Sequence, residues 1–225
     1  MEKTDLPPFS GVQCGLCAGT ETVYYTADRY REYVICRTCN LVFVPETYRI
    51  SGTKEKARYD LHENHPDDPG YRKFLSRLFA PVCSRLAQGA SGLDFGCGPG
   101  PALAAMFREQ GYHVDTYDKF YACNPAVFEN KYDFITASEV LEHLHHPGCE
   151  LERLWGMLKT GGILGIMTKL VHSRQAFEKW HYKNDETHVC FFSKPAFQWL
   201  ADAWQAPVEF VGNDVVLITK TRAGG

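Results

Sequence analysis

Two Cys-x-x-Cys pairs near the N-terminus present four thiols that suit a metal ion. Cys14 and Cys17 form the first pair and Cys36 and Cys39 the second, with eighteen residues between the pairs. Two such pairs supply the four thiolates that structural Zn²⁺ prefers, and they leave no open coordination position for catalysis. A redox pair or unrelated thiols are the alternatives, but redox Cys-x-x-Cys motifs usually occur singly at the start of a helix. The pattern therefore predicts a structural zinc ribbon.

A glycine-rich stretch in the middle of the chain has the pattern of a cofactor-binding turn. The segment Leu93-Asp94-Phe95-Gly96-Cys97-Gly98-Pro99-Gly100 breaks an apolar run, and apolar residues then resume at helical spacing. Glycine lets the backbone bend and lets a ligand lie close to it, while the free amides of a helix start favour acceptor atoms. A dinucleotide-binding turn would need a third glycine where Pro101 stands. We therefore expect a strand, a tight turn and a helix that bind another cofactor.

An acidic residue two positions before Gly-x-Gly-x-Gly resembles the first motif of the class I S-adenosylmethionine-dependent methyltransferases. Three further matches follow in order. Asp118 closes the next apolar segment, 132–135 leads into Ser-Glu-Val-Leu-Glu-His-Leu at 138–144, and 158–164 resembles the family's double-glycine turn and fifth strand. The resemblance covers residues 57–220 and implies an α/β, Rossmann-like sheet with S-adenosylmethionine as cofactor. The alternative is the set of turns of some other open α/β sheet.

The resemblance also implies which residues contact the cofactor. Asp118 would accept hydrogen bonds from both ribose hydroxyls, and Asp94 would face the ammonium group of the methionine portion. The segment before the first strand often covers the cofactor in this family, so Tyr59 and His62 are candidates, with a solvated loop as the alternative. Tyr71 begins a helical stripe and is either a core residue or a cofactor contact. The predicted cofactor-binding residues are Asp94, Gly96, Cys97, Gly98, Gly100, Asp118, Ser138, Tyr59 and Tyr71.

The connection after the second strand departs from the family pattern. Only thirteen residues separate Asp118 from Tyr132, too few for a helix, a third strand and a return. The third strand is therefore expected to be short or missing, which leaves the adenine contacts unassigned. Segments 208–211 and 215–219 are expected to close the sheet as an antiparallel pair. The predicted fold class is α/β, a Rossmann-like class I methyltransferase sheet with a small N-terminal zinc ribbon.

Residues 180–193 interleave aromatic side chains with polar groups that can transfer protons. This segment follows the fourth and fifth strands, where class I enzymes place their substrate. Methyl transfer mainly needs alignment, and it needs a base only if the acceptor holds a proton. Two histidines are the base candidates because imidazole titrates near neutrality, with an aspartate to orient them and a tyrosine as hydrogen-bonding partner; the alternative is a polar loop whose histidines only satisfy backbone groups. The predicted catalytic residues are His188, His181, Asp185 and Tyr182, together with Glu139 at the end of the fourth strand.

A second group of metal-binding residue types lies at 143–149. His143 belongs to the family-like Glu-His pair, whereas His145, His146 and Cys149 surround a Pro-Gly turn without the spacing of helical ligands. We therefore assign no second metal site from the sequence.

Length, charge and cysteine content limit the organisation and the partners of the chain. The 225 residues divide into a zinc-ribbon module (1–50), a lid with an N-terminal helix (51–92) and a cofactor-binding domain (93–225). No segment approaches the ~20 apolar residues of a membrane span. Nine cysteines without a secretion signal favour the reducing cytoplasm. The net charge of −3 argues against a strongly basic nucleic-acid-binding surface.

The acceptor of the methyl group remains open at this stage. Zinc ribbons precede ribosomal RNA guanine methyltransferases and also some sugar and natural-product methyltransferases, so the layout does not choose between them. The lack of basic runs favours a small metabolite slightly over an RNA base. The competing hypothesis is a module in which the ribbon binds RNA or protein and the sheet is a degenerate cofactor holder.

Overall fold

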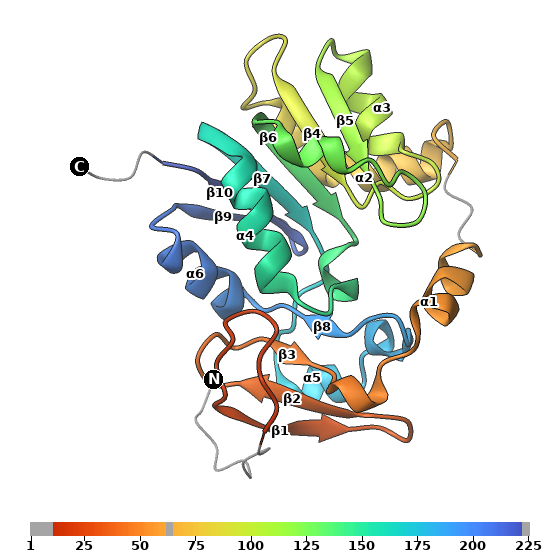
Figure 1. Cartoon of the computed structure of the whole chain (residues 1–225), viewed down its shortest axis with the longest axis vertical. Helices are drawn as coiled ribbons and strands as arrows, with labels where there is room; N and C mark the ends of the chain where they lie inside the picture. Colours follow the sequence, from red (N-terminus) through yellow and green to blue (C-terminus); the bar gives the residue numbers. More distant parts are fainter. Residues whose placement is uncertain (1–10, 62–64, 222–225) are drawn as a thin grey trace.

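The computed structural model describes residues 11–61 and 65–221. Its larger sheet consists of β4 (Ser91–Phe95), β5 (His113–Tyr117), β6 (Tyr132–Ser138), β7 (Leu158–Met167), β9 (Val208–Val211) and β10 (Val215–Thr219). These strands lie in the order β5-β4-β6-β7-β10-β9 (Figure 1). The first four are parallel, and β10 is antiparallel to both of its neighbours. The predicted Rossmann-like sheet and its antiparallel closing pair are confirmed.

The third strand of the usual class I sheet is missing, as the short connection predicts. In the described part of the chain, the connection from β5 to β6 contains only the 3₁₀ helix η2 (Pro125–Glu129). The edge of the sheet is therefore β5, which pairs with β4 alone.

Helices cover both faces of the sheet because the strands are apolar on both sides. On β6, Phe134 belongs to the core with α2 (Pro69–Cys83) and α3 (Ala102–Glu109), whereas its neighbour Ile135 belongs to the core with α4 (Pro147–Met157) and α6 (Lys194–Ala203). Ser193 begins α6 as predicted, since its hydroxyl accepts a hydrogen bond from the amide of Ala196 at 3.2 Å.

A second, smaller sheet joins the N-terminal module to a strand from the C-terminal half of the chain. It contains β1 (Thr22–Ala27), β2 (Glu32–Cys36), β3 (Val42–Phe43) and β8 (Cys190–Phe191) in the order β1-β2-β3-β8, all antiparallel. β3, the last strand of the ribbon, pairs on its other side with β8 from the larger domain. β8 lies within residues 180–193, so the N-terminal module and the segment predicted to carry catalytic residues share one sheet.

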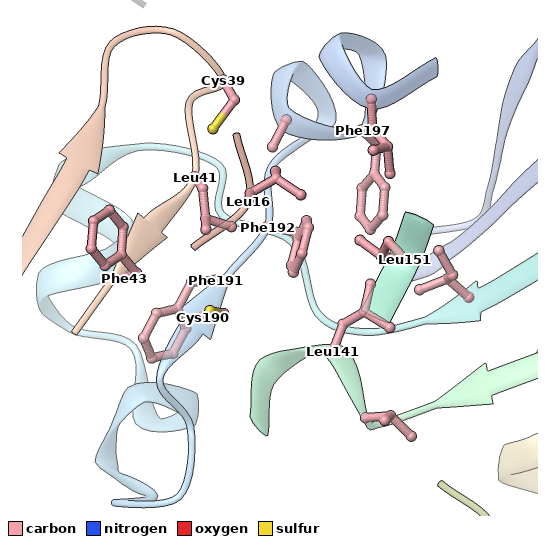
Figure 2. Close-up of a cluster of buried hydrophobic side chains, with 14 of the residues drawn as sticks. Leu16, Cys39, Leu41, Phe43, Leu141, Leu151, Cys190, Phe191, Phe192 and Phe197 are labelled. Carbon is pink, nitrogen blue, oxygen red and sulfur yellow. The ribbon is translucent and has the colours of Figure 1, made fainter. Parts of the chain in front are cut away.

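Figure 2 shows that one hydrophobic core continues across this junction. Phe43 of β3 and Phe191 of β8 are 1% exposed, and the core runs on through Phe192 to Phe197 of α6. The turn between Cys14 and Cys17, the first cysteine knuckle, also contacts α4. There the amide of Gly148 donates to the carbonyl of Gly15 at 2.9 Å. The ribbon is therefore packed against the larger domain as part of one core.

Shorter elements complete the chain. The helix α1 (Gly52–Tyr59) lies between the two sheets in Figure 1, and α5 (Arg174–Glu178) contacts β1. The 3₁₀ helices are η1 (Glu46–Tyr48), η3 (Leu141–His143) and η4 (His181–Asn184). Within 11–61 and 65–221, every helix is too short or too polar to span a bilayer.

Candidate active site

A cavity of about 400 Å³ opens at the carboxyl ends of β4, β5 and β6. Its lining comes from the glycine-rich loop after β4, the segment after β5, the segment after β6, the helices α1 and α2, and His188. Ligands of open α/β sheets bind at this edge, and the volume is that of a small-molecule site.

The glycine-rich loop has the backbone that its sequence demands. Gly96 and Gly98 have φ angles of +73° and +64°, a region that side chains rarely adopt. A Cβ atom at Gly96 would lie 2.4 Å from Val140, while at Gly98 it would meet nothing within 4 Å. Together with Cys97, these glycines line the cavity, so the loop offers bare backbone to a ligand.

Asp118 lies at the mouth of this loop, as predicted for the ribose contact. Its carboxylate accepts hydrogen bonds from the amide of Gly98 at 3.1 Å and from the amides of Phe120 and Tyr121 at 2.8 and 3.2 Å. These bonds fix the carboxylate between the loop and the end of β5. Ser138, at the end of β6, also lines the cavity.

Two predicted cofactor contacts do not line the cavity. Asp94 is 3% exposed and accepts a hydrogen bond from Thr136 at 3.0 Å, since this position of β4 faces into the sheet. Burial raises the pKa of Asp94 to about 7. Gly100 is buried at the start of α3, where its carbonyl accepts from the amide of Ala102. The structure therefore places Asp94 and Gly100 as supports of the loop.

The helix α1 covers one side of the cavity. Tyr59 lines it, with its hydroxyl 3.1 Å from Glu55 and its ring edge-on to His143 at 5.1 Å. Glu55 is buried and pairs with Lys119 at 2.8 Å, which ties α1 to the segment after β5. Tyr71 of α2 lines the cavity as well, and burial raises its pKa to about 12. His62 lies outside the described residues.

Two buried carboxylates lie at the polar end of the cavity. Glu139 has a φ angle of +53°, rare for any residue but glycine, and its Oε1 is buried without a hydrogen-bond partner among the described residues. The hydroxyl of Tyr182 donates to Glu142 and lies 3.3 Å from Oε2 of Glu139, while Thr168 donates to the second oxygen of Glu142 at 2.9 Å. Burial raises the pKa of Glu139 to about 7 and that of Glu142 to about 8.

Two imidazoles face the same end. The Nδ1 atom of His188 lies 2.7 Å from the carbonyl of Tyr182, and the Nδ1 atom of His143 lies 3.2 Å from the carbonyl of Thr187. A carbonyl can only accept, so each Nδ1 carries the proton and each Nε2 has a free lone pair. Burial lowers the pKa of both rings, that of His143 to about 3. Both histidines are therefore neutral at pH 7.

Two of the predicted catalytic residues, His181 and Asp185, do not line the cavity. His181 is exposed next to Lys169 and does not line the cavity. Asp185 uses Oδ1 to accept from the amide and hydroxyl of Thr187, and its Oδ2 is 4.0 Å from Nε2 of His188, beyond hydrogen-bonding distance. His188 is thus oriented by a backbone carbonyl and not by Asp185.

Two residues of this site, Glu142 and His143, were absent from the predicted catalytic set. The available signal was the Glu-His pair itself, but its partner His188 comes from a segment more than forty residues further along the chain. The sequence gives no measure of that distance in space.

The four N-terminal cysteines form a compact thiol cluster. Their sulfur atoms all lie within 4.8 Å of one another, and the Cys14–Cys39 and Cys17–Cys36 pairs are each 3.5 Å apart. A tetrahedral Zn²⁺ with bonds of ~2.3 Å requires sulfur separations of ~3.8 Å. The amides of Leu16 and Gly19 also point at sulfur atoms at 3.4 Å, which stabilises thiolates. The donor set fits the predicted ion.

The ribbon holds the segment that carries His188. The guanidinium of Arg31, which is 7% exposed, donates to the carbonyls of Lys183, Asp185 and Glu186. The ammonium of Lys183 pairs with Asp28 of the ribbon at 3.0 Å. Residues 183–186 are therefore held by contacts with the turn between β1 and β2.

Comparisons with known proteins agree with the fold and the loop. The sequence model of a methyltransferase domain family matches residues 64–206. A search of curated proteins finds no match. Among solved structures, the fold is similar to that of an O-methyltransferase family protein from Burkholderia thailandensis, with a TM-score of 0.50, 17% identity, and coverage of 76% of this chain and 64% of that chain.

Two further structures cover more of their own length. The 1,6-didemethyltoxoflavin-N1-methyltransferase of Burkholderia thailandensis, solved with 1,6-didemethyltoxoflavin and S-adenosylhomocysteine, has a TM-score of 0.51 at 18% identity, covering 88% of this chain and 99% of that chain. A SAM-dependent methyltransferase from Archaeoglobus fulgidus has a TM-score of 0.50 at 14% identity, covering 66% and 94%.

The sheet, the glycine-rich loop and the strand-end carboxylate together define a class I S-adenosylmethionine-binding domain. The match spans more than half of the chain, so the protein belongs to this methyltransferase family and is an S-adenosylmethionine-dependent methyltransferase. The cavity fits that cofactor, because bare backbone at Gly98 and a fixed carboxylate at Asp118 face the same space.

Proposed function

We propose that this enzyme methylates a hydroxyl group of a small molecule inside the cavity described above. The observation that carries the proposal is the continuity of one cavity from the glycine-rich loop to the buried carboxyl group of Glu139. When bound, S-adenosylmethionine supplies an activated methyl group whose transfer to oxygen releases a proton. The chain must therefore hold the cofactor, align the acceptor and take up that proton.

In this proposal the cofactor is held from the β4 side of the cavity. The backbone of Gly96 and Gly98 supports its methionine portion, and Asp118 accepts from the ribose hydroxyls. Asp118 already accepts hydrogen bonds from three backbone amides, which hold the carboxylate in place. Tyr59 and Tyr71 close the cavity from α1 and α2 and exclude water from it.

Glu139 is the group that we assign to receive the acceptor's proton. Its Oε1 has no hydrogen-bond partner within residues 11–61 and 65–221, and a pKa of about 7 matches a general base that works near neutral pH. Its left-handed backbone costs ~1–3 kcal/mol, the kind of strain that concentrates at functional sites. Tyr182 holds the neighbouring oxygen of Glu139, and His188 is the second base candidate at this end of the cavity.

A small acceptor is favoured over RNA by shape and by charge. The helix α1 and His188 contribute to the walls, so the acceptor would lie between these elements and the glycine-rich loop. Three carboxyl groups line the cavity, those of Asp118, Glu139 and Glu142, against one ammonium group, that of Lys119. Such a lining gives a phosphate backbone little to bind.

The test is transfer of label from methyl-tritiated S-adenosylmethionine to two fractions of one cell extract, small molecules and total RNA. We expect label in the small-molecule fraction. Glu139→Gln should slow transfer by about 100-fold without changing the affinity for S-adenosylhomocysteine, because it removes only the base. Glu129→Gln, an exposed residue of η2, is the matched control and should transfer normally. Label in RNA, or a Glu139→Gln enzyme as fast as the wild type, would contradict the proposal.

We further propose that the four thiols bind one structural Zn²⁺. The ion would fix the knuckles on which β1, β2 and β3 depend, and the larger domain supplies the fourth strand of that sheet. Metal analysis of the purified protein should find one zinc per chain, and Cys36→Ser should lose it with a marked fall in stability. Cys123→Ser, which changes an exposed thiol, should keep the zinc. A wild-type protein that folds equally well without zinc would refute this role.

A further inference from the structure

Three potential metal ligands from two distant segments meet in the cavity. They are Glu142 and His143 of η3, and His188, which lies two residues before β8. One ligand atom of each lies within 4.8 Å of the others. None of the four cysteines takes part, so this cluster is separate from the ribbon thiols.

The two imidazoles are oriented as metal ligands usually are. Metal-binding histidines commonly donate their second ring nitrogen to a carbonyl or carboxylate, which fixes the tautomer. Here both Nδ1 atoms lie against backbone carbonyls, at 2.7 Å for His188 and 3.2 Å for His143. The two rings pack edge to face with centroids 4.7 Å apart, and both Nε2 atoms keep free lone pairs.

The carboxylate of the cluster lacks a positive partner. Glu142 is 0% exposed, and in the described part of the chain no ion pair includes it. Its two oxygens accept hydrogen bonds from the neutral hydroxyls of Tyr182 and Thr168. Buried carboxylates are normally paired with a cation or bound to a metal ion.

We propose that Glu142, His143 and His188 bind one divalent first-row transition-metal ion such as Mn²⁺. Two imidazoles and a carboxylate suit such ions, whereas the four thiolates of the ribbon suit Zn²⁺. Bonds of ~2.1 Å place neighbouring ligand atoms roughly 3–3.5 Å apart, and the three ligand atoms already lie within 4.8 Å of one another. Three protein ligands leave coordination positions open, as in catalytic metal sites.

The site deepens the proposed function and, for this step alone, rests on it. The cluster lines the same cavity as the glycine-rich loop, so an open coordination position is available to the hydroxyl of the acceptor. A bound cation lowers the pKa of such a hydroxyl and holds its oxygen in place. His188 then serves as a ligand, which leaves Glu139 to receive the proton.

Mn²⁺ titration followed by electron paramagnetic resonance tests the site on the full-length protein with its ribbon zinc retained. We expect one saturable Mn²⁺ per chain, with couplings from two imidazole nitrogens. His143→Gln and His188→Gln should each weaken Mn²⁺ binding by about tenfold or more. His181→Gln, which changes an exposed histidine outside the cavity, should bind Mn²⁺ like the wild type.

Absence of saturable Mn²⁺ binding, or a bound Mn²⁺ without nitrogen coupling, would overturn the site without reference to any variant. Unchanged binding in both histidine variants would do the same. Calorimetry with S-adenosylhomocysteine on the same samples separates this inference from the proposed function. A wild-type protein that binds Mn²⁺ but not S-adenosylhomocysteine would refute methyl transfer and leave the metal site standing.

Discussion

Arg31→Met should remove the hydrogen bonds by which the ribbon holds residues 183–186. The buried guanidinium donates to three backbone carbonyls in residues 183–186 and to the hydroxyl of Tyr33 at 3.0 Å. Methionine fills a similar volume but donates nothing, so those carbonyls lose their partner. The segment that precedes His188 would then lose its main fixed contacts with β2.

The size of the effect follows from these bonds. A hydrogen bond to a charged donor contributes ~1.5–3 kcal/mol, and breaking a buried network by removing one partner costs ~3–5 kcal/mol because water replaces only part of it. We therefore expect Arg31→Met to lower the free energy of unfolding by about 3–5 kcal/mol. For a protein of this size the melting temperature should fall by roughly 10 °C.

Urea unfolding measures the stability, and calorimetry and label transfer measure the site. Arg29→Met is the matched control, since Arg29 is exposed and its guanidinium only covers the exposed ring of Tyr30. Arg31→Met should keep its affinity for S-adenosylhomocysteine, because Asp118 and the glycine-rich loop lie in the other sheet, while methyl transfer slows. If Arg31→Met unfolds within ~0.5 kcal/mol of Arg29→Met, the ribbon does not brace this segment.

Two further predictions concern packing and pH. A Cβ at Gly148 would lie 2.2 Å from the carbonyl oxygen of Leu16, so Gly148→Ala should destabilise by ~1–3 kcal/mol in urea unfolding, whereas Gly156→Ala in the same helix has open space and should be neutral or stabilising. Equal effects of the two alanine substitutions would show that the close contact between Gly148 and the backbone of Leu16 does not contribute to stability. Burial raises the pKa of Asp94 to about 7, so the folded state binds this proton more tightly than the unfolded state and stability falls as pH rises from about 4 to about 7. The stability of the wild type relative to Asp94→Asn should therefore drop by roughly 2–4 kcal/mol across that range, and a pH-independent difference would contradict the burial argument.

Local patterns account for most of the fold that could be predicted. The glycine-rich loop, the absence of a third strand and the closing hairpin each depend on residues close together in the sequence. The structure has all three features as predicted. The pairing of β3 with β8 could not be predicted, because the two strands lie almost 150 residues apart in the sequence. A two-residue strand carries no periodic pattern from which such a pairing could be inferred.

In the site, too, features that depend on local sequence could be predicted, whereas those that depend on distant segments could not. Asp118 and the loop glycines follow from the order of the strands, since carboxyl ends of parallel strands share one edge. Asp94 does not line the cavity, because its side chain lies beside Thr136 of the neighbouring strand, and strand position alone did not predict this. The meeting of Glu142 and His143 with His188 depends on how the ribbon and β8 hold residues 183–188, which only the folded structure reveals.

Calorimetric titration with S-adenosylhomocysteine tests most directly whether this cavity is the cofactor site. The wild-type protein should bind one molecule per chain, and Asp118→Ala should lose about 10- to 100-fold in affinity, as expected for a carboxylate that bonds a ribose in a partly buried site. Asp67→Ala, an exposed aspartate before α2, should bind like the wild type. Equal affinity of Asp118→Ala and the wild type, or no binding at all, would show that the cavity does not hold the cofactor in this way.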